Sequence, residues 1–147
     1  MKHLYGKNVE RMKSFDASLW KDAIANQVDI GDEELYYANE DEPDKKYLPL
    51  FESWTSLVDP KIPWQNVEES MFPICFTIIE DNGKRVVFSI MVGQGSASSI
   101  CSIDNFKEWM KRCENKYIFD ETKFITVDEL EKIFKETIEE YEEMFKE

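Results

Sequence analysis

The chain has 147 residues, of which 42% are apolar and 14% aromatic, and its formal net charge is −13. Disordered chains combine high charge with low hydrophobicity, so this composition argues against disorder and predicts a single globular domain spanning residues 1–147. No apolar run approaches the roughly 20 residues that cross a bilayer, and no apolar segment follows Lys2 as in a secretory signal, so we expect a cytoplasmic protein with no membrane partner.

The N-terminal part of the chain predicts two helices separated by an acidic loop. Residues 17–25 place apolar side chains at helical spacing, and residues 48–58 begin with Pro49, a residue favoured in the first turn of a helix. Residues 29–46 between them are polar and rich in acids, with no apolar periodicity. We therefore expect residues 29–46 to form a loop.

The strongest local pattern is a β-hairpin in the middle of the chain. Phe72–Glu80 and Arg85–Val92 are rich in apolar residues and flank Asn82-Gly83, the preferred pair for a two-residue type I′ turn. Apolar residues on both strand faces predict interior strands covered by helices. The turn predicts the register, which pairs Asp81 with Lys84, Glu80 with Arg85, Ile79 with Val86, Ile78 with Val87, Thr77 with Phe88 and Cys75 with Ile90.

The residues after the hairpin predict a flexible connection followed by a helix. Gly93–Ser99 follows a strand and precedes a helix, where phosphate-binding loops occur, but it lacks the glycine and lysine spacing of those loops and the Gly-x-Ser-x-Gly pattern of a nucleophile elbow. The helix is expected from about Asn105 to Cys113, with Ser102 or Asp104 as its cap.

The C-terminal residues predict a short strand, Lys123–Ile125, and a long helix. Thr126 and Glu129 fit a capping box, and an apolar stripe follows opposite a glutamate-rich face. Together the elements predict an α/β fold of the α+β type. Its small mixed or antiparallel sheet contains the central hairpin of about residues 72–92 and is covered by helices, including the long C-terminal one.

Cysteine, histidine and acid spacing give no sign of a catalytic or metal centre. Cys75, Cys101 and Cys113 are too few and scattered for a disulfide framework or a zinc site. The single histidine, His3, stands near a chain end, where a catalytic triad is improbable. The acidic stretches lack the spacing of a calcium loop. We expect no metal or cofactor, and the balance leans away from an enzyme.

The negative charge is concentrated in two blocks. Residues 29–59 contain ten acidic and two basic residues, and residues 127–147 contain nine acidic and three basic residues. Such a field repels nucleic acid and speeds association with cationic proteins. We therefore expect a basic protein partner, with no direct binding of nucleic acid, and leave the oligomeric state open.

The segment Asp29–Asp44 is the strongest candidate for a partner-binding site. It contains eight acidic residues and no basic ones, with tyrosines among and after them. Aromatic anchors within a polar rim are typical of interfaces. The alternative is a solvated loop whose Tyr36 and Tyr37 pack back onto the core. The candidate residues are Asp32, Glu33, Glu34, Tyr36, Tyr37, Glu40, Asp41, Glu42, Asp44 and Tyr47.

Three functions fit these observations. The favoured one is an acidic inhibitor of the immunity-protein or antitoxin type, which masks the basic surface of a toxin or nucleic-acid-processing enzyme. A phage-type DNA mimic or anti-defence protein is the second, with carboxylates in place of phosphates. A small enzyme or ligand-binding domain that uses Gly93–Ser99 is the third, and it predicts a polar pocket at the end of Arg85–Val92.

Overall fold

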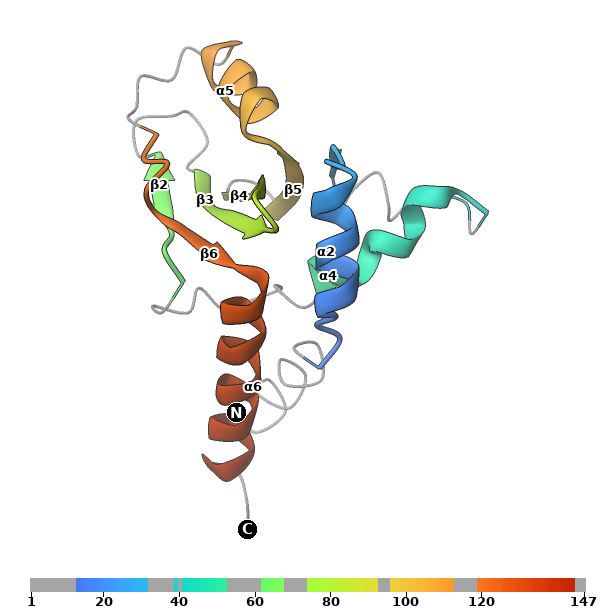
Figure 1. Cartoon of the computed structure of the whole chain (residues 1–147), viewed down its shortest axis with the longest axis vertical. Coiled ribbons are helices and arrows are strands. Elements are labelled where there is room, and N and C mark those ends of the chain that lie inside the picture. Colours follow the sequence, from blue (N-terminus) through green and yellow to red (C-terminus); the bar gives the residue numbers. More distant parts are fainter. Residues whose placement is uncertain are drawn as a thin grey trace.

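The computed structural model describes residues 13–31, 39, 41–52, 62–67, 74–92, 96–112 and 119–144. Figure 1 shows a sheet flanked by helices, with helix α6 extending away from the sheet toward the C-terminus. In chain order the elements are α2 Ala17–Ala25, β1 Ile30–Gly31, the 3-10 helix η1 Pro43–Tyr47, α4 Leu48–Glu52, β2 Gln65–Val67, β3 Ile74–Asp81, β4 Lys84–Val92, β5 Ser96–Ser102, α5 Ile103–Arg112, β6 Phe124–Thr126 and α6 Val127–Met144.

The described strands form one mixed sheet of six strands. Five follow the order β1-β5-β4-β3-β2 with antiparallel neighbours, and β6 pairs in parallel with β3. Residues 74–76 of β3 pair with β2, and residues 78–80 pair with β6, so both short strands lie along the same edge of β3. The predicted α+β fold, with a mixed sheet and a long C-terminal helix, is confirmed.

The central hairpin has the predicted register. All the predicted pairs, from Asp81 with Lys84 to Cys75 with Ile90, are present. Asn82 has a φ of 50° and Gly83 a φ of 80°, the left-handed values that a type I′ turn requires. β3 and β4 are interior strands of the sheet, and their fully buried apolar residues include Ile78, Ile79, Val86, Val87 and Phe88.

Helices cover both faces of the sheet. Successive side chains of a strand point to opposite faces, so β3 and β4 contribute to a core on each side. On one face Phe88 packs in a cluster with α2, α4 and α6, and the Trp20 ring meets it edge-on at a centroid distance of 5.9 Å. On the other face Phe76 packs against Phe106 of α5 at 4.8 Å. The apolar character of both strand faces is thus explained by two separate core clusters.

The prediction that residues 29–46 form a loop is wrong at both ends of that range. Ile30–Gly31 forms β1 and adds a strand to the edge of β5, and η1 begins at Pro43. The predicted helix before this segment is present as α2, where the Asp16 carboxylate accepts the Leu19 N–H at 3.2 Å. α4 begins as expected, while residues 53–58 of the predicted helix lie outside the described residues.

The predicted flexible connection at Gly93–Ser99 is also wrong where the structure describes it. Ser96–Ser102 forms β5, which pairs along β4 from Val86 to Val92. Backbone pairing with an interior strand outweighs the modest strand propensity of serine, since tertiary context decides in sheets. Ser102 then caps α5 as predicted, because its Oγ accepts the Asn105 N–H at 3.2 Å.

α6 begins at the predicted cap and packs the described part of the predicted stripe against the core, with Ile133, Ile138 and Tyr141 partly buried. The Thr126 hydroxyl accepts the Glu129 N–H at 3.2 Å and donates to the Glu129 carboxylate at 3.0 Å. Leu130 is fully buried and Phe134 is 7% exposed, so both face the core cluster. The predicted strand before the helix is present as β6.

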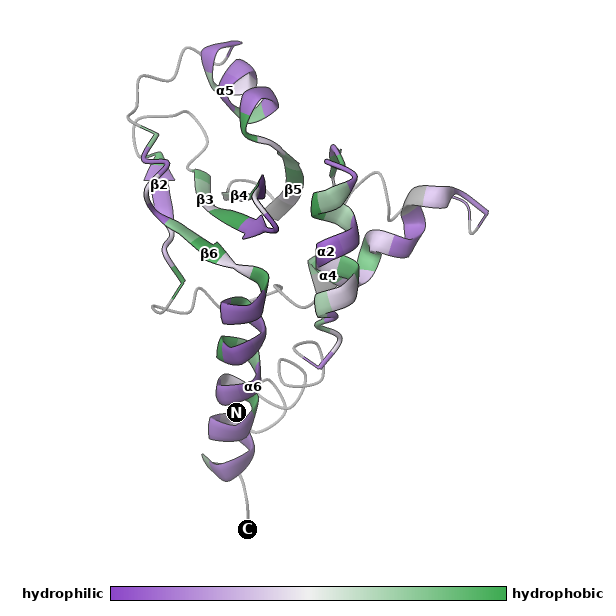
Figure 2. Ribbon diagram, viewed as in Figure 1, coloured by the Kyte–Doolittle hydropathy of each residue, from purple (hydrophilic) through white to green (hydrophobic). Residues whose placement is uncertain are grey.

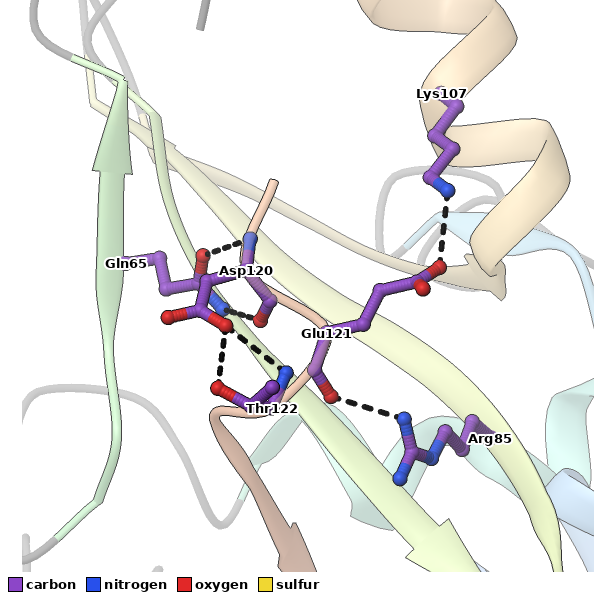
Figure 3. Close-up of polar contacts among 6 residues, drawn as sticks. All are labelled: Gln65, Arg85, Lys107, Asp120, Glu121 and Thr122. Carbon is purple, nitrogen blue, oxygen red and sulfur yellow. Dashed lines mark hydrogen bonds and ion pairs between the residues drawn. The ribbon is translucent and has the colours of Figure 1, made fainter. Parts of the chain in front are cut away.

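A polar cluster holds the connection that leads into β6 (Figure 3). The buried side-chain amide of Gln65 donates to the Asp120 carbonyl at 2.9 Å and accepts the Asp120 N–H at 3.1 Å. The Glu121 carbonyl accepts a hydrogen bond from Arg85 at 3.0 Å, and its carboxylate pairs with Lys107 at 2.9 Å. The cluster joins β2, β4 and α5 to this connection and so helps to position α6.

Candidate functional site

The structure describes only part of the predicted partner-binding segment. Asp41 and Glu42 are exposed where the chain leads into η1. The backbone of Asp44 lies in η1, and its side chain is outside the description. Because they fall outside the described residues, six candidates stay predictions: Asp32, Glu33, Glu34, Tyr36, Tyr37 and Glu40.

Tyr47 lies in the core and not on the surface where an anchor is needed. Its side chain is 3% exposed, and its hydroxyl donates to Oδ2 of Asp22 on α2 at 2.7 Å. Burial raises the pKa of Tyr47, while the hydrogen bond from Tyr47 and then that from Lys46 lower the pKa of Asp22. Because so little of the ring is exposed, it cannot project into a partner as an anchor, and we remove Tyr47 from the candidate anchors.

A hollow of about 420 Å³ lies next to this contact, and we call it the Asp29 hollow. Oδ2 of Asp29 accepts a hydrogen bond from Nδ2 of Asn105 on α5 at 2.9 Å. The hollow is within the size range of sites that bury a small ligand, about 300–1,000 Å³. Its described lining residues are Asn26, Val28, Asp29, Ile30, Pro43, Lys46 and Tyr47.

The last turns of α6 carry an acidic face. Four glutamates recur there at three- and four-residue steps, the spacing that brings side chains together on one side of a helix. Figure 2 shows α6 as largely hydrophilic along the turns that extend from the sheet. Together with Met144, which is 69% exposed, these residues line a shallow hollow of about 680 Å³; the four are Glu136, Glu139, Glu140 and Glu143.

Two acidic regions, one at Asp41 and Glu42 and one on the glutamate face of α6, lie apart in the described part of the protein. In Figure 1 the turquoise segment of residues 41–52 projects to the right of α2, while the last turns of α6 point down and away from the sheet. On α2, between them, Lys21 pairs with Asp128 at 3.2 Å. A partner that contacts both regions must therefore be large or must wrap around α2.

The two described cysteines are buried or partly buried, and the described residues form no metal centre. Cys101 is 9% exposed, and burial raises its pKa to about 12, which disfavours a reactive thiolate at neutral pH. Burial also raises the pKa of Cys75. Within the described residues, no three His, Cys, Asp or Glu side chains are grouped to hold a metal ion. Of the Gly93–Ser99 segment, residues 96–99 belong to β5 and residues 93–95 lie outside the description.

Sequence reasoning missed two features of the candidate surface. The glutamates of α6 were recognised as a charged helix face but not as site residues, although their spacing on one face was available from the sequence. The Asp29 hollow gave no local signal, because its walls come from the end of α2, from β1 and from η1. Only the packing of these three elements creates it.

Comparisons with known proteins assign no family to the chain. No protein-family model, no curated protein and no solved structure matches it. Among the helices that the structure describes, none combines the length and the apolar character needed to cross a membrane.

Proposed function

We propose that the protein binds a basic protein partner and inhibits it by covering its cationic surface, as an immunity protein or antitoxin does. The partner class we infer is a toxin or a nucleic-acid-processing enzyme, because proteins that bind nucleic acid use lysine and arginine on phosphates. The observation that carries the proposal is the acidic face of α6, with four glutamates over the last turns of a helix that extends from the sheet.

This acidic face lowers the stability of the helix that bears it. Like charges three or four residues apart repel by about 0.2–0.5 kcal/mol per pair. The last turn of α6 also contains no basic residue, so its glutamates oppose the helix dipole. The apolar inner face, including Leu130 and Phe134, holds the helix in place. Local departures from the most stable sequence of a helix are typical of functional surfaces.

Charge complementarity explains how such a surface would act. A negative field speeds the encounter with a positive surface by roughly 10- to 1,000-fold and loses this effect as salt is added. Asp41 and Glu42 are exposed and add to the field from a second region. The acidic and tyrosine residues between Asp32 and Glu40 remain predicted contributors.

A DNA mimic is the second candidate, and the shape of α6 favours it. The helix has 18 residues, which corresponds to a length of about 27 Å. Its four glutamates lie along one face over about 10 Å of that length, so carboxylates succeed one another over the last two turns as phosphates do on DNA. The partner would then be a DNA-binding enzyme of a defence system. Competition with duplex DNA for the partner distinguishes this candidate from an inhibitor that binds elsewhere on a toxin.

We also propose that the protein acts in the cytoplasm. Cys75 and Cys101 are free thiols on β3 and β5, which are separated in the sheet by β4. A reducing compartment keeps such thiols reduced. The remaining interpretation, an enzyme that uses Gly93–Ser99, stays a prediction, because residues 93–95 lie outside the described residues.

The test is capture of partners from a lysate of the source cells on the immobilised full chain, followed by reconstitution with one purified partner. We expect a protein with a basic surface, which loses its own activity when the chain is added in equimolar amount. Its association with the chain should slow as ionic strength rises. Capture of acidic proteins only, or an association rate that does not change with ionic strength, would contradict the proposal.

A further inference from the structure

The Asp29 hollow is assembled from three separate parts of the chain. Asn26 is the cap at the end of α2, Asp29 and Ile30 follow it, and Pro43 and Lys46 belong to η1. The contact between Tyr47 and Asp22 holds η1 against α2 beside the hollow. The hollow therefore has walls that are fixed by the fold on opposite sides.

Among the described residues around the hollow, one carboxylate has no cation paired with it. The ammonium of Lys46 lies 3.2 Å from Oδ2 of Asp22, so its charge is balanced by that acid. The carboxylate of Asp29 accepts a hydrogen bond from the amide of Asn105, which orients it without neutralising it. Among the described residues, no lysine or arginine forms an ion pair with Asp29. Its charge is available to a ligand.

Apolar groups line the hollow near this carboxylate. Val28 and Pro43 offer surface on which the aliphatic stem of a long basic side chain can pack while its charged head meets an acid. A guanidinium presents five donors in one plane, and arginine is enriched among the residues that anchor interfaces. We propose that the Asp29 hollow receives an arginine side chain of the basic partner. This inference rests on the proposed function, because it names the anchor of that partner.

Titration of the full chain with N-acetyl-L-arginine methylamide, followed by backbone amide chemical shifts, tests the hollow without the partner. We expect saturable shifts at residues 28–31 and at Lys46. Asp29→Asn keeps the size of the side chain and removes its charge, so it should weaken binding about tenfold. The matched control is Asp104→Asn, which alters an exposed acid of α5 and should leave the affinity unchanged. N-acetyl-L-lysine methylamide should bind more weakly than the arginine probe.

Three results would overturn the arginine site: no saturable shift, equal losses in the two variants, or equal affinity for the lysine probe. With the reconstituted partner, Asp29→Asn should speed dissociation about tenfold, and Asp104→Asn should not. If the partner binds in a salt-dependent way but dissociates from Asp29→Asn at the wild-type rate, the arginine site is wrong and the proposed function stands. If no basic partner is found, the proposed function fails and the anchor fails with it, whatever the arginine probe does.

Discussion

The hydroxyl of Tyr47 donates a hydrogen bond of 2.7 Å to Oδ2 of Asp22 and joins the end of η1 to α2. The same carboxylate accepts from the amide of Asn26 at 3.2 Å and pairs with Lys46 at 3.2 Å. One aspartate thus ties the end of the acidic segment to the body of the protein. Tyr47 therefore holds the chain in place just after the segment Asp29–Asp44, which contains the other candidate contact residues of this region.

Tyr47→Phe should lower the free energy of unfolding without weakening partner binding. The variant keeps the buried ring and removes one hydrogen bond, so we expect a loss of about 0.5–1.5 kcal/mol in urea denaturation. Partner dissociation should stay close to the wild-type rate and well below that of Asp29→Asn, because the ring keeps its place in the wall of the Asp29 hollow and only 3% of it is exposed. Unchanged stability together with faster dissociation would show that Tyr47 contacts the partner after all.

The same contact predicts how stability depends on pH. The hydrogen bond from Tyr47, and next that from Lys46, lowers the pKa of Asp22 from 3.8, so the folded state favours the ionised carboxylate. This stabilisation is present above the unfolded pKa and is lost as pH falls through the lower, folded one. Between about pH 5 and pH 2, the free energy of unfolding should therefore fall more steeply for the wild type than for Asp22→Asn. Tyr47→Phe should lie between them in thermal denaturation, and parallel curves would contradict this explanation.

The hairpin turn predicts a contrast between two glycines. Gly83 has a φ of 80°, and an added Cβ would meet nothing within 4 Å, so Gly83→Ala should cost about 1–2 kcal/mol for backbone conformation alone. Gly31→Ala is the control, because its Cβ would lie at an ordinary 3.7 Å from the Ser98 carbonyl oxygen. Urea denaturation of both variants measures the difference. Equal losses would show that the positive φ at Gly83 is not the cause.

Phe134→Ala tests the packing of α6 on the sheet. The Phe134 ring is 7% exposed and stacks on Phe15 at a centroid distance of 4.6 Å. Its removal leaves a cavity, so we expect a loss of about 3–5 kcal/mol in chemical denaturation. Met144→Ala, at a position 69% exposed on the same helix, should change stability by less than about 0.5 kcal/mol. Similar small losses in both would mean that α6 does not depend on this contact.

The parts of the fold that local sequence patterns determine could be predicted. The register of the hairpin follows from Asn82-Gly83, because a two-residue turn leaves one way to align the strands that it joins. The start of α6 follows from Thr126 and Glu129, which form the cap that their spacing predicts. In both places the turn or cap residues and the apolar pattern indicate the same structure.

The parts of the fold that depend on contacts between residues distant in the sequence could not be predicted. β5 consists largely of small polar residues, and it is a strand because β4 offers it a backbone to pair with. The partner of Tyr47 is 25 residues away, so nothing near the tyrosine indicates that it is buried. The acidic face of α6 was visible in the sequence, but its spacing alone does not separate a binding surface from a solvated helix face.

The most direct test of the central claim is the association rate of a purified basic partner with three forms of the full chain at two ionic strengths. The forms are the wild type, the double variant Glu139→Lys with Glu143→Lys on α6, and the control Asp104→Lys with Glu108→Lys on α5. All four positions are exposed, and both variants change the net charge equally. We predict that the α6 variant associates more slowly and with a weaker salt dependence, while the control keeps the rate of the wild type. Equal slowing in both variants would contradict the proposal, because it would show that only the net charge of the protein matters and not the position of the glutamates on α6.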